Sequence, residues 1–405
     1  MTLVYERAIG GPATHAIVIG VGYYPALAPA ADLPSAAAGA ELTADWLIRH
    51  ADALQPRLGS VELLIASPGG ASAQYTWFGR MPSAGAIDPR GSSAVDPATA
   101  AKVAAAAATW RARCFSGGDN TALVYACGHG VATGARMMVL LSDLRSNPAY
   151  LWNPHIDLLT EVSRMRRAEG LGRGLLFVDT CQEIVTETII AEASQQQAIG
   201  QPIDLFAPST SAPKNKVYAL VPGPMGALAY DDGEGGGGRF THILLEALGG
   251  AAAWNYAGTG AWAVTSDTLH TKMKQLYELR PEWAAHSLEP TTVAQLVDGG
   301  PIVVFPDAPQ VPICVQLAPG GAVRAVDRLR LLDSASNVVL DRQFVEPGFA
   351  RAETWVARPV AALGAHFLEA SFTAEHPWQY PHKRTQIDIS EMRVRPVLTH
   401  DVSTP

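Results

Sequence analysis

The chain has few cysteines and no cluster of basic residues. Four cysteines occur among its 405 residues, and no two of them form a CxxC pair. This spacing excludes a disulfide framework and a zinc knuckle, and it favours a reducing compartment. Lys and Arg number 30 against 38 Asp and Glu, so the formal net charge is −8. An acidic chain without a basic run lacks the charge pattern of proteins that bind nucleic acid or anionic membranes, and we expect neither partner.

Long hydrophobic runs are missing as well. No stretch is apolar over the roughly 18 residues that a membrane helix needs, and the first residues lack the basic start and apolar core of a secretory signal. We therefore expect a cytoplasmic protein. Hydrophobic residues nevertheless make up 48% of the chain and charged residues 17%, a balance that predicts a large core divided over about two domains.

Short β-branched runs alternate with helical stretches over most of the chain. This alternation predicts an α/β domain with a mainly parallel sheet covered by helices on both faces. The expected strands are Ala16–Val21, Val61–Ala66, Thr121–Cys127, Gly174–Asp179 and Ile203–Ala207. The expected helices are Glu41–Leu54, Pro97–Arg113, Pro154–Arg167, Gly238–Gly249 and Ser266–Leu279.

The pattern of hydrophobic residues changes in about the last quarter of the sequence. Short alternating runs, separated by Pro, Gly, Asn and Asp, predict a small all-β domain, an immunoglobulin-like sandwich. We place the α/β domain at residues 1–305, a proline-rich linker at 306–312 and the β-sandwich domain at 313–405. The runs are Cys314–Leu317, Arg328–Leu332, Val338–Leu340, Thr354–Ala357, His366–Phe372 and Arg393–Leu398.

Two of the expected strands end in residue types that carry chemistry. His129 follows one strand between two glycines, and Cys181 follows another. Reactive groups gather at the carboxyl ends of parallel strands, and a cysteine beside a histidine forms a nucleophile with a partner for proton transfer. The N–H groups of Gly130 and Cys181 are candidates for holding the oxyanion. Each residue also has a structural interpretation, since a histidine in a turn and a buried cysteine are common without function.

Six segments of the chain resemble the caspase-like cysteine peptidases, and among them the metacaspases and bacterial orthocaspases. The resemblance covers about Thr14–Val304 and keeps the family's order of segments. It implies a caspase-like fold with Cys181 as nucleophile and His129 as its partner. The six segments are His15–Gly20, Leu33–Leu42, Tyr125–Gly130, Val178–Gln182, Phe206–Ser211 and Gly238–Leu248.

The resemblance also bears on specificity. Relatives with Asp two residues before the cysteine cut after Arg or Lys, so Asp179 implies a protein or peptide substrate with a basic P1 residue. A carboxylate on the floor of a pocket pairs with a guanidinium group in bidentate geometry. This physical argument agrees with the basic P1 residue that the resemblance implies. The family's second pocket carboxylate corresponds to Asp32, and Ser209 is a further candidate because it follows the expected strand Ile203–Ala207. Asp179 has a structural alternative, in which it only orders its loop.

The chain departs from the family in two respects. Residues 174–213 contain no Lys or Arg, so an enzyme cutting after basic residues cannot process itself there, and Lys214 and Lys216 are the nearest alternatives. We therefore predict an active single chain. Several metacaspases need calcium, but the acidic run at 231–234 lacks the ligand spacing of a calcium loop. We expect no metal and no cofactor.

The sequence thus predicts a Cys-His endopeptidase that acts through a thioester. The resemblance adds a bacterial defence or cell-death role, and the β domain is expected to dock a regulatory protein. Two alternatives stay open. One is a catalytically silent scaffold with the same fold, and the other is an Arg-specific peptidase of the clostripain and gingipain type.

Overall fold

The structure is a computed structural model of the whole chain. The residues it describes are 2–75, 93–133, 136–146, 152–181, 183–184, 200–223, 236–255, 261–278, 290–294, 300–307, 309–318, 326–343, 354–362, 364–372, 383–389 and 397–401.

A seven-stranded sheet forms the centre of the first part of the chain. Its inner strands β3, β2, β6, β10 and β12 run parallel, while β1 and β15 add antiparallel edges. The inner strands are buried along nearly their whole length, as expected for a sheet covered on both faces. In spatial order the strands are β1 (Leu3–Glu6), β3 (Leu58–Ala66), β2 (Thr14–Val21), β6 (Asn120–Gly128), β10 (Leu171–Thr180), β12 (Lys216–Val221) and β15 (Thr291–Ala294).

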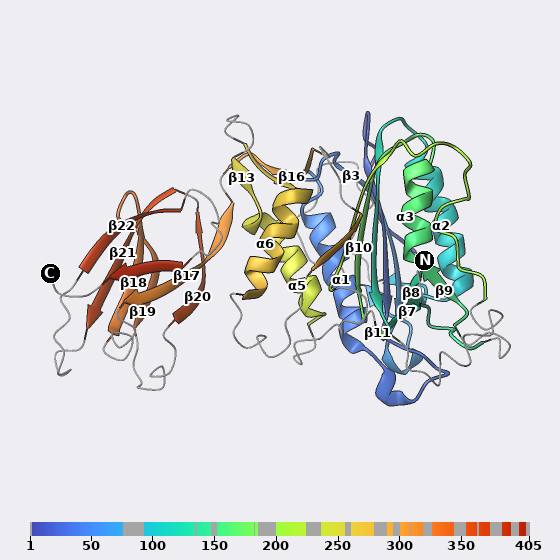
Figure 1. Cartoon of the computed structure of the whole chain (residues 1–405), viewed down its shortest axis with the longest axis horizontal. Helices are drawn as coiled ribbons and strands as arrows, with labels where there is room; N and C mark the ends of the chain where they lie inside the picture. The colour runs from blue at the N-terminus through green and yellow to red at the C-terminus, as the bar shows by residue number, and fades with distance from the viewer. Residues whose placement is uncertain are drawn as a thin grey trace. The chain divides into compact units, whose positions relative to one another are not determined.

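Helices cover both faces of this sheet, so the predicted mixed α/β architecture with a mainly parallel sheet is confirmed. Helix α1 (Pro34–Arg49) packs on β2, β3 and β6. Helices α2 (Ala100–Cys114) and α3 (Leu158–Arg167) lie on the opposite side in Figure 1. There they bury the alternate side chains of the strands in one core, which includes Ile17 and Val124.

Two helices begin later than the sequence predicts. Helix α2 starts at Ala100 because its cap is distant in sequence, with Oδ1 of Asp143 accepting from the Ala100 N–H at 2.9 Å. Asp96, which directly precedes the predicted start at Pro97, forms an ion pair with Lys102. Helix α3 is preceded by a short strand, β9 (His155–Asp157), and capped by the Asp157 side chain. Helix α1 in turn begins at Pro34, upstream of the predicted start.

The predicted strand Ile203–Ala207 is wrong. The fifth parallel strand is β12, further along the chain, which pairs with β10. Leu205 and Phe206 are fully buried, but they serve as anchors rather than as a strand. The Phe206 ring packs edge-on against Trp110 with the ring centroids 5.1 Å apart, and its N–H donates to Glu161 Oε2. An apolar run of this length is equally compatible with either role.

A small second sheet continues from the end of β6. Its order is β11, β7, β8, β9, and β7 and β8 form an antiparallel hairpin. Because β7 starts directly after His129, this sheet fixes the chain on the far side of the histidine. The bounds are β7 (Gly130–Thr133), β8 (Arg136–Leu140) and β11 (Glu183–Ile184).

Two further helices agree with the predictions from sequence. Helix α5 spans Arg239–Glu246 and passes into a π-helical turn at Ala247–Ala251, and α6 spans Ser266–Glu278. The shorter elements are two 3-10 turns, η1 (Pro29–Ala31) and η2 (Pro68–Gly70), and the strands β4 (Gln74–Tyr75), β5 (Ser93–Ala94), β13 (Trp254–Asn255), β14 (Trp262–Thr265) and β16 (Pro301–Phe305).

The chain divides into two compact units. The first comprises 1–245, 265–270 and 286–304, and the second comprises 246–264, 271–285 and 305–405. All described elements after β16 are strands, arranged in a three-stranded sheet (β20, β17, β23) and a four-stranded one (β19, β18, β21, β22). They are β17 (Gln310–Ala318), β18 (Val326–Asp333), β19 (Val338–Gln343), β20 (Thr354–Ala362), β21 (Gly364–Phe372), β22 (Lys383–Ile389) and β23 (Val397–Asp401).

Strand β18 shows the alternation that builds the four-stranded sheet. Leu329 and Leu331 are buried and stand opposite Ala370 and Leu368 of β21. Arg328, at the other parity, makes a two-pronged ion pair with Asp341 of β19. One face of this sheet is therefore apolar and the other charged, as the period of two in the sequence implies.

Candidate active site

The carboxyl ends of β6 and β10 bring the predicted pair of residues together. The two strands are parallel neighbours in which Gly128 stands opposite Thr180. His129 and Cys181 are the residues that follow this pair, and adjacent strands lie only about 4.8 Å apart. Both side chains are half-buried. The structure therefore places the predicted nucleophile and its predicted partner side by side at one edge of the sheet.

Hydrogen bonds hold His129 on three sides. Its N–H donates to the Tyr24 hydroxyl at 2.7 Å, and its carbonyl accepts from the Leu140 N–H at 3.0 Å. Its Nε2 lies 2.8 Å from the carbonyl oxygen of Ala31. A carbonyl can only accept, so Nε2 carries the proton in the neutral ring. Nδ1 is then the basic nitrogen, and among the described residues it has no partner.

Cys181 is a more accessible thiol than Cys114 or Cys127. Cys114 and Cys127 are buried, and burial raises the pKa of Cys127 far above its ordinary value. That thiol therefore stays protonated, as the structural interpretation of a buried cysteine expects. Cys181 is only half-buried, and its carbonyl packs so tightly against Gly130 that no Cβ fits between them. The close approach of the two backbones depends on this glycine.

Asp179 lies on the same strand as Cys181, two residues earlier, and is 4% exposed. Its Oδ2 accepts the hydroxyl of Thr241 at 2.5 Å and the Thr241 N–H at 3.3 Å, while its Oδ1 accepts nothing from the described residues. Thr241 belongs to the first turn of α5, where the helix dipole favours a negative charge. Burial nevertheless outweighs these hydrogen bonds and raises the pKa of Asp179 to about 6.

The two remaining pocket candidates lie in different places. Asp32 is half-buried and directly follows Ala31, the residue that holds the imidazole, so it belongs to the same edge of the sheet. Ser209 does not. It accepts from the N–H of Ser211, whose own carbonyl is bound by Arg167 at the end of α3. Because α3 leads into the start of β10, this loop lies at the opposite edge of the sheet from Cys181.

Three residues of the site escape sequence reasoning. Tyr24 and Ala31 come from the loop after β2, and Thr241 comes from α5, more than a hundred residues beyond His129. The sequence carries no signal for the Ala31 contact, since a backbone carbonyl is present in every residue. Among these three residues only Thr241 has a sequence signal, because a small hydroxyl residue in the first turn of a helix is a frequent partner for a carboxylate.

Nothing in the described part of the chain suggests a metal site. Its residues bring together no group of three or more His, Cys, Asp or Glu side chains that could hold an ion. The acidic run at 231–234 lies outside the described residues. Across the described segments no helix has the length and apolarity needed to cross a membrane.

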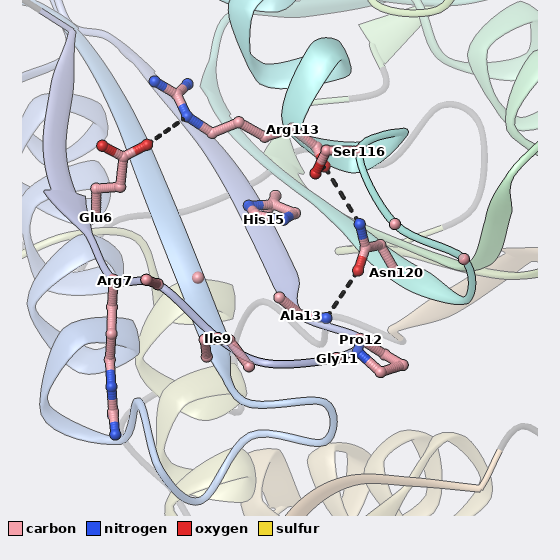
Figure 2. Close-up of a pocket in the computed structure, with 14 residues that line it drawn as sticks. Glu6, Arg7, Ile9, Gly11, Pro12, Ala13, His15, Arg113, Ser116 and Asn120 are labelled. Carbon is pink, nitrogen blue, oxygen red and sulfur yellow. Dashed lines mark hydrogen bonds and ion pairs between the residues drawn. The ribbon is translucent and has the colours of Figure 1, made fainter.

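A separate pocket of about 800 Å³ opens at the other edge of the sheet, beside the start of β6. Figure 2 shows Glu6 joined to Arg113 and Asn120 joined to the backbone of Ala13. His15 also lines it, and burial, together with the charge of Arg113, lowers the pKa of this histidine to about 4. The nine residues of β6 span about 30 Å, so this pocket is remote from His129.

Comparison with known proteins finds a likeness among solved structures. No family model matches the chain, and no curated protein matches it. Among solved structures, caspase-1 from Spodoptera frugiperda is similar over 72% of this chain and 89% of its own, with a TM-score of 0.39 and 14% sequence identity.

Proposed function

We propose that the chain is a cysteine endopeptidase that cleaves peptide bonds after Arg or Lys. One observation carries the proposal. In the pairing of β6 with β10, Gly128 stands opposite Thr180, so His129 and Cys181 follow paired residues on adjacent strands. A histidine whose Nε2 is already bound to a carbonyl, and whose Nδ1 is open, is prepared to exchange a proton with that thiol.

The chemistry follows from these positions. Nδ1 of His129 takes the proton of the Cys181 thiol, and the thiolate attacks the carbonyl carbon of the scissile bond. The resulting imidazolium gives its proton to the leaving nitrogen, which departs as an amine and leaves a thioester. Nδ1 then accepts a proton from water as the water attacks the thioester, and the C–S bond breaks to release the carboxylic acid product. The proton passes from Nδ1 to the Cys181 thiolate, which restores the starting pair. Ala31 binds Nε2 throughout, so only Nδ1 changes its proton.

Backbone N–H groups at this edge support the assigned oxyanion hole. Leu140 donates to the carbonyl of His129, so Gly130 and Val139 form the next pair, which has no hydrogen bonds of its own. The N–H of such a residue points away from its partner strand. For Gly130 that direction is toward β11, the strand that begins just after Cys181. We assign the oxyanion to the N–H groups of Gly130 and Cys181.

Asp179 supplies the basis for a preference for Arg or Lys. Its Oδ2 is held by Thr241, whereas Oδ1 has no partner among the described residues. A buried carboxylate with one open oxygen attracts a guanidinium or ammonium group and repels an acidic side chain. We include Asp32 as the second pocket carboxylate, because it lies beside the loop that holds His129. Ser209 is left out because it lies at the other edge.

Fluorogenic peptides that differ only in P1 test this function. Matched peptides ending in Arg, Lys or Asp are incubated with the native protein and with Cys181→Ala, with and without calcium. Cys114→Ala is the matched control, since it removes a buried thiol from α2. We expect turnover of the Arg and Lys peptides that disappears in Cys181→Ala, persists in Cys114→Ala and does not depend on calcium.

Other outcomes would overturn parts of the proposal. Turnover of the Asp peptide alone would remove Asp179 as the basis of specificity and leave the Cys-His chemistry intact. Absence of turnover, together with no labelling of Cys181 by a thiol-reactive peptide with Arg at P1, would favour the catalytically silent scaffold. Turnover that survives in Cys181→Ala would place the nucleophile elsewhere.

The remaining parts of the proposal concern the setting of the enzyme. An enzyme whose nucleophile is a reduced thiol suits a reducing compartment, and we propose the cytoplasm. We retain the division into a peptidase domain (1–305), a linker (306–312) and an immunoglobulin-like sandwich (313–405), with the last as a docking site for a regulatory protein. The defence role remains a prediction from the resemblance.

A further inference from the structure

The hydroxyl of Tyr24 occupies the position of a missing strand hydrogen bond. Leu140 of β8 donates its N–H to the carbonyl of His129 at 3.0 Å. In a hydrogen-bonded antiparallel pair the return bond runs from the other residue's N–H to the first residue's carbonyl. Here the His129 N–H donates to the Tyr24 hydroxyl at 2.7 Å, and that hydroxyl donates to the Leu140 carbonyl at 3.3 Å. The hydroxyl therefore bridges the two groups and holds them apart.

The surroundings are built to admit this hydroxyl. Gly128, the residue before His129, has φ +156°, and a Cβ on it would stand 2.7 Å from the Tyr24 oxygen. Only glycine leaves that space and adopts that backbone conformation without strain. A hydrogen bond joins the two ends of the loop that carries Tyr24, since the Leu33 N–H donates to the Gly22 carbonyl at 2.9 Å. Tyr24 is 1% exposed, so its hydroxyl is fixed and shielded from water.

The same loop also holds the imidazole. Ala31 lies seven positions after Tyr24 and accepts from Nε2 of His129 at 2.8 Å. The rings of Tyr24 and His129 contact each other, with centroids 4.8 Å apart and an angle of 42° between their planes. One loop thus fixes the backbone, the ring plane and the protonated nitrogen of the histidine. Burial also raises the pKa of Tyr24 far above its ordinary value, so the hydroxyl remains a donor at every working pH.

We propose that Tyr24 is a positioning residue for His129. By keeping the His129 N–H and the Leu140 carbonyl apart, its hydroxyl sets the backbone position from which Nε2 reaches Ala31 and Nδ1 is left open. The role of Nδ1 in peptide hydrolysis rests on the proposed function, but the placement of the ring does not. Without the hydroxyl, the His129 N–H and the Leu140 carbonyl close directly on each other, and the ring is drawn away from Ala31.

The test compares Tyr24→Phe with Tyr23→Phe, which removes a hydroxyl from the neighbouring position of the same loop. Proteins with ¹⁵N-labelled histidine report the tautomer of His129 by NMR, identified by its loss in His129→Gln. We expect the Nε2-protonated form in the native protein and in Tyr23→Phe, and a mixture of tautomers in Tyr24→Phe.

Kinetics provide the second measurement. We expect kcat on an Arg peptide to fall roughly 10- to 100-fold in Tyr24→Phe, the range for a small misplacement of a reacting group, with KM changed less than about twofold. We also measure how the rate of alkylation of Cys181 by iodoacetamide depends on pH. This dependence is expected to shift in Tyr24→Phe and to stay unchanged in Tyr23→Phe. Alkylation does not require the protein to be a peptidase.

These readouts separate the two proposals. A single unchanged tautomer and unchanged alkylation in Tyr24→Phe would overturn the positioning role, even if the native protein cleaves peptides. Conversely, a native protein that cleaves no peptide but shows the tautomer and alkylation changes would overturn the proposed function and retain the positioning role. If Tyr24→Phe does not fold, Gly128→Ala takes its place, because the added Cβ would stand 2.7 Å from the Tyr24 oxygen and displace it. A single unchanged tautomer in that variant would equally overturn the positioning role.

Discussion

Thr241 donates its hydroxyl to Oδ2 of Asp179 over 2.5 Å, and this bond joins helix α5 to the strand that carries the nucleophile. The hydroxyl of Tyr125 lies 2.6 Å from the same Thr241 oxygen. Since the single hydroxyl hydrogen of Thr241 goes to the carboxylate, Tyr125 is the donor in this second bond. A chain of hydrogen bonds therefore runs from β6 through α5 to β10. It joins Tyr125, four residues before His129, to Asp179, two residues before Cys181. It orients Asp179 so that only Oδ1 remains open.

Replacing Asp179 with Asn is expected to reduce cleavage after Arg and Lys. Asn keeps the size and an acceptor for Thr241 but removes the charge that attracts the P1 side chain. Removing one partner of a buried charge pair costs about 2 to 5 kcal/mol, so kcat/KM for the Arg peptide should fall roughly 30-fold to several thousand-fold. Alkylation of Cys181 is the control and should be unchanged. Equal cleavage of the Arg peptide by both proteins would exclude Asp179 from the P1 pocket.

The same carboxylate is expected to make stability depend on pH. Burial raises the pKa of Asp179 to about 6, whereas the unfolded value is about 3.9. Between these values the folded chain holds a proton that the unfolded chain has released, so the free energy of unfolding falls as pH rises from about 4 to 6. A shift of about two units corresponds to roughly 3 kcal/mol. The free energy of unfolding, measured with urea, should be higher in Asp179→Asn than in the native protein, and the difference should be larger above pH 6 than at pH 4. A lower free energy of unfolding in Asp179→Asn above pH 6 would contradict this prediction.

The regular elements at the candidate site are those that the sequence predicts best. The strands ending at Gly128 and Thr180 are continuous apolar runs, and a polar residue after such a run marks the strand end. The prediction of a strand at Ile203–Ala207 rests on the same apolar pattern, and there it is wrong. Pattern alone does not distinguish an apolar anchor such as Phe206 from a buried strand, and the true neighbour of β10, Lys216–Val221, is equally apolar.

The contacts that orient the site are beyond such reasoning. Tyr24 and Ala31 reach His129 across about a hundred residues of sequence, and Asp143 caps α2 across about forty. These contacts depend on how the loop after β2 folds back over the sheet edge. Local propensity contains no information on that path, because it is fixed by tertiary packing.

Replacing Thr241 with Val is expected to shift the activity profile. Val keeps the shape but leaves Oδ2 of Asp179 with only the backbone N–H, and it removes the Thr241 oxygen that accepts from Tyr125. Each such loss costs about 1 to 3 kcal/mol of stability. Because the lost hydrogen bond lowers the pKa of Asp179, that pKa should rise further, and cleavage of the Arg peptide should begin at a higher pH. Thr241→Ser keeps the hydroxyl and should behave as the native protein does.

Replacing Gly130 with Ala is expected to separate the catalytic pair. The new Cβ would meet the Cys181 carbonyl and would stand 2.6 Å from the Thr180 hydroxyl. Neither backbone yields without moving a strand end, so Cys181 must shift relative to His129. A displacement of about 1 Å costs on the order of 100-fold in rate, and overpacking costs about 1 to 3 kcal/mol of stability. Gly10→Ala, where nothing lies within 4 Å, is the control. Full activity of Gly130→Ala would contradict the tight packing.

The enzyme is expected to remain a single chain while active. Residues 174–213 contain no Lys or Arg, and the first basic residue after them is tied down. Lys214 and Asn215 both donate their N–H groups to the carbonyl of Arg166, at 2.8 and 3.0 Å, and Lys216 begins β12. A peptidase binds an extended and accessible segment, which this stretch does not offer. Intact mass after long incubation with substrate should equal the starting mass. A pair of fragments produced by a cut after Lys214 or after Lys216, absent from the Cys181→Ala protein, would contradict this prediction and reveal self-processing.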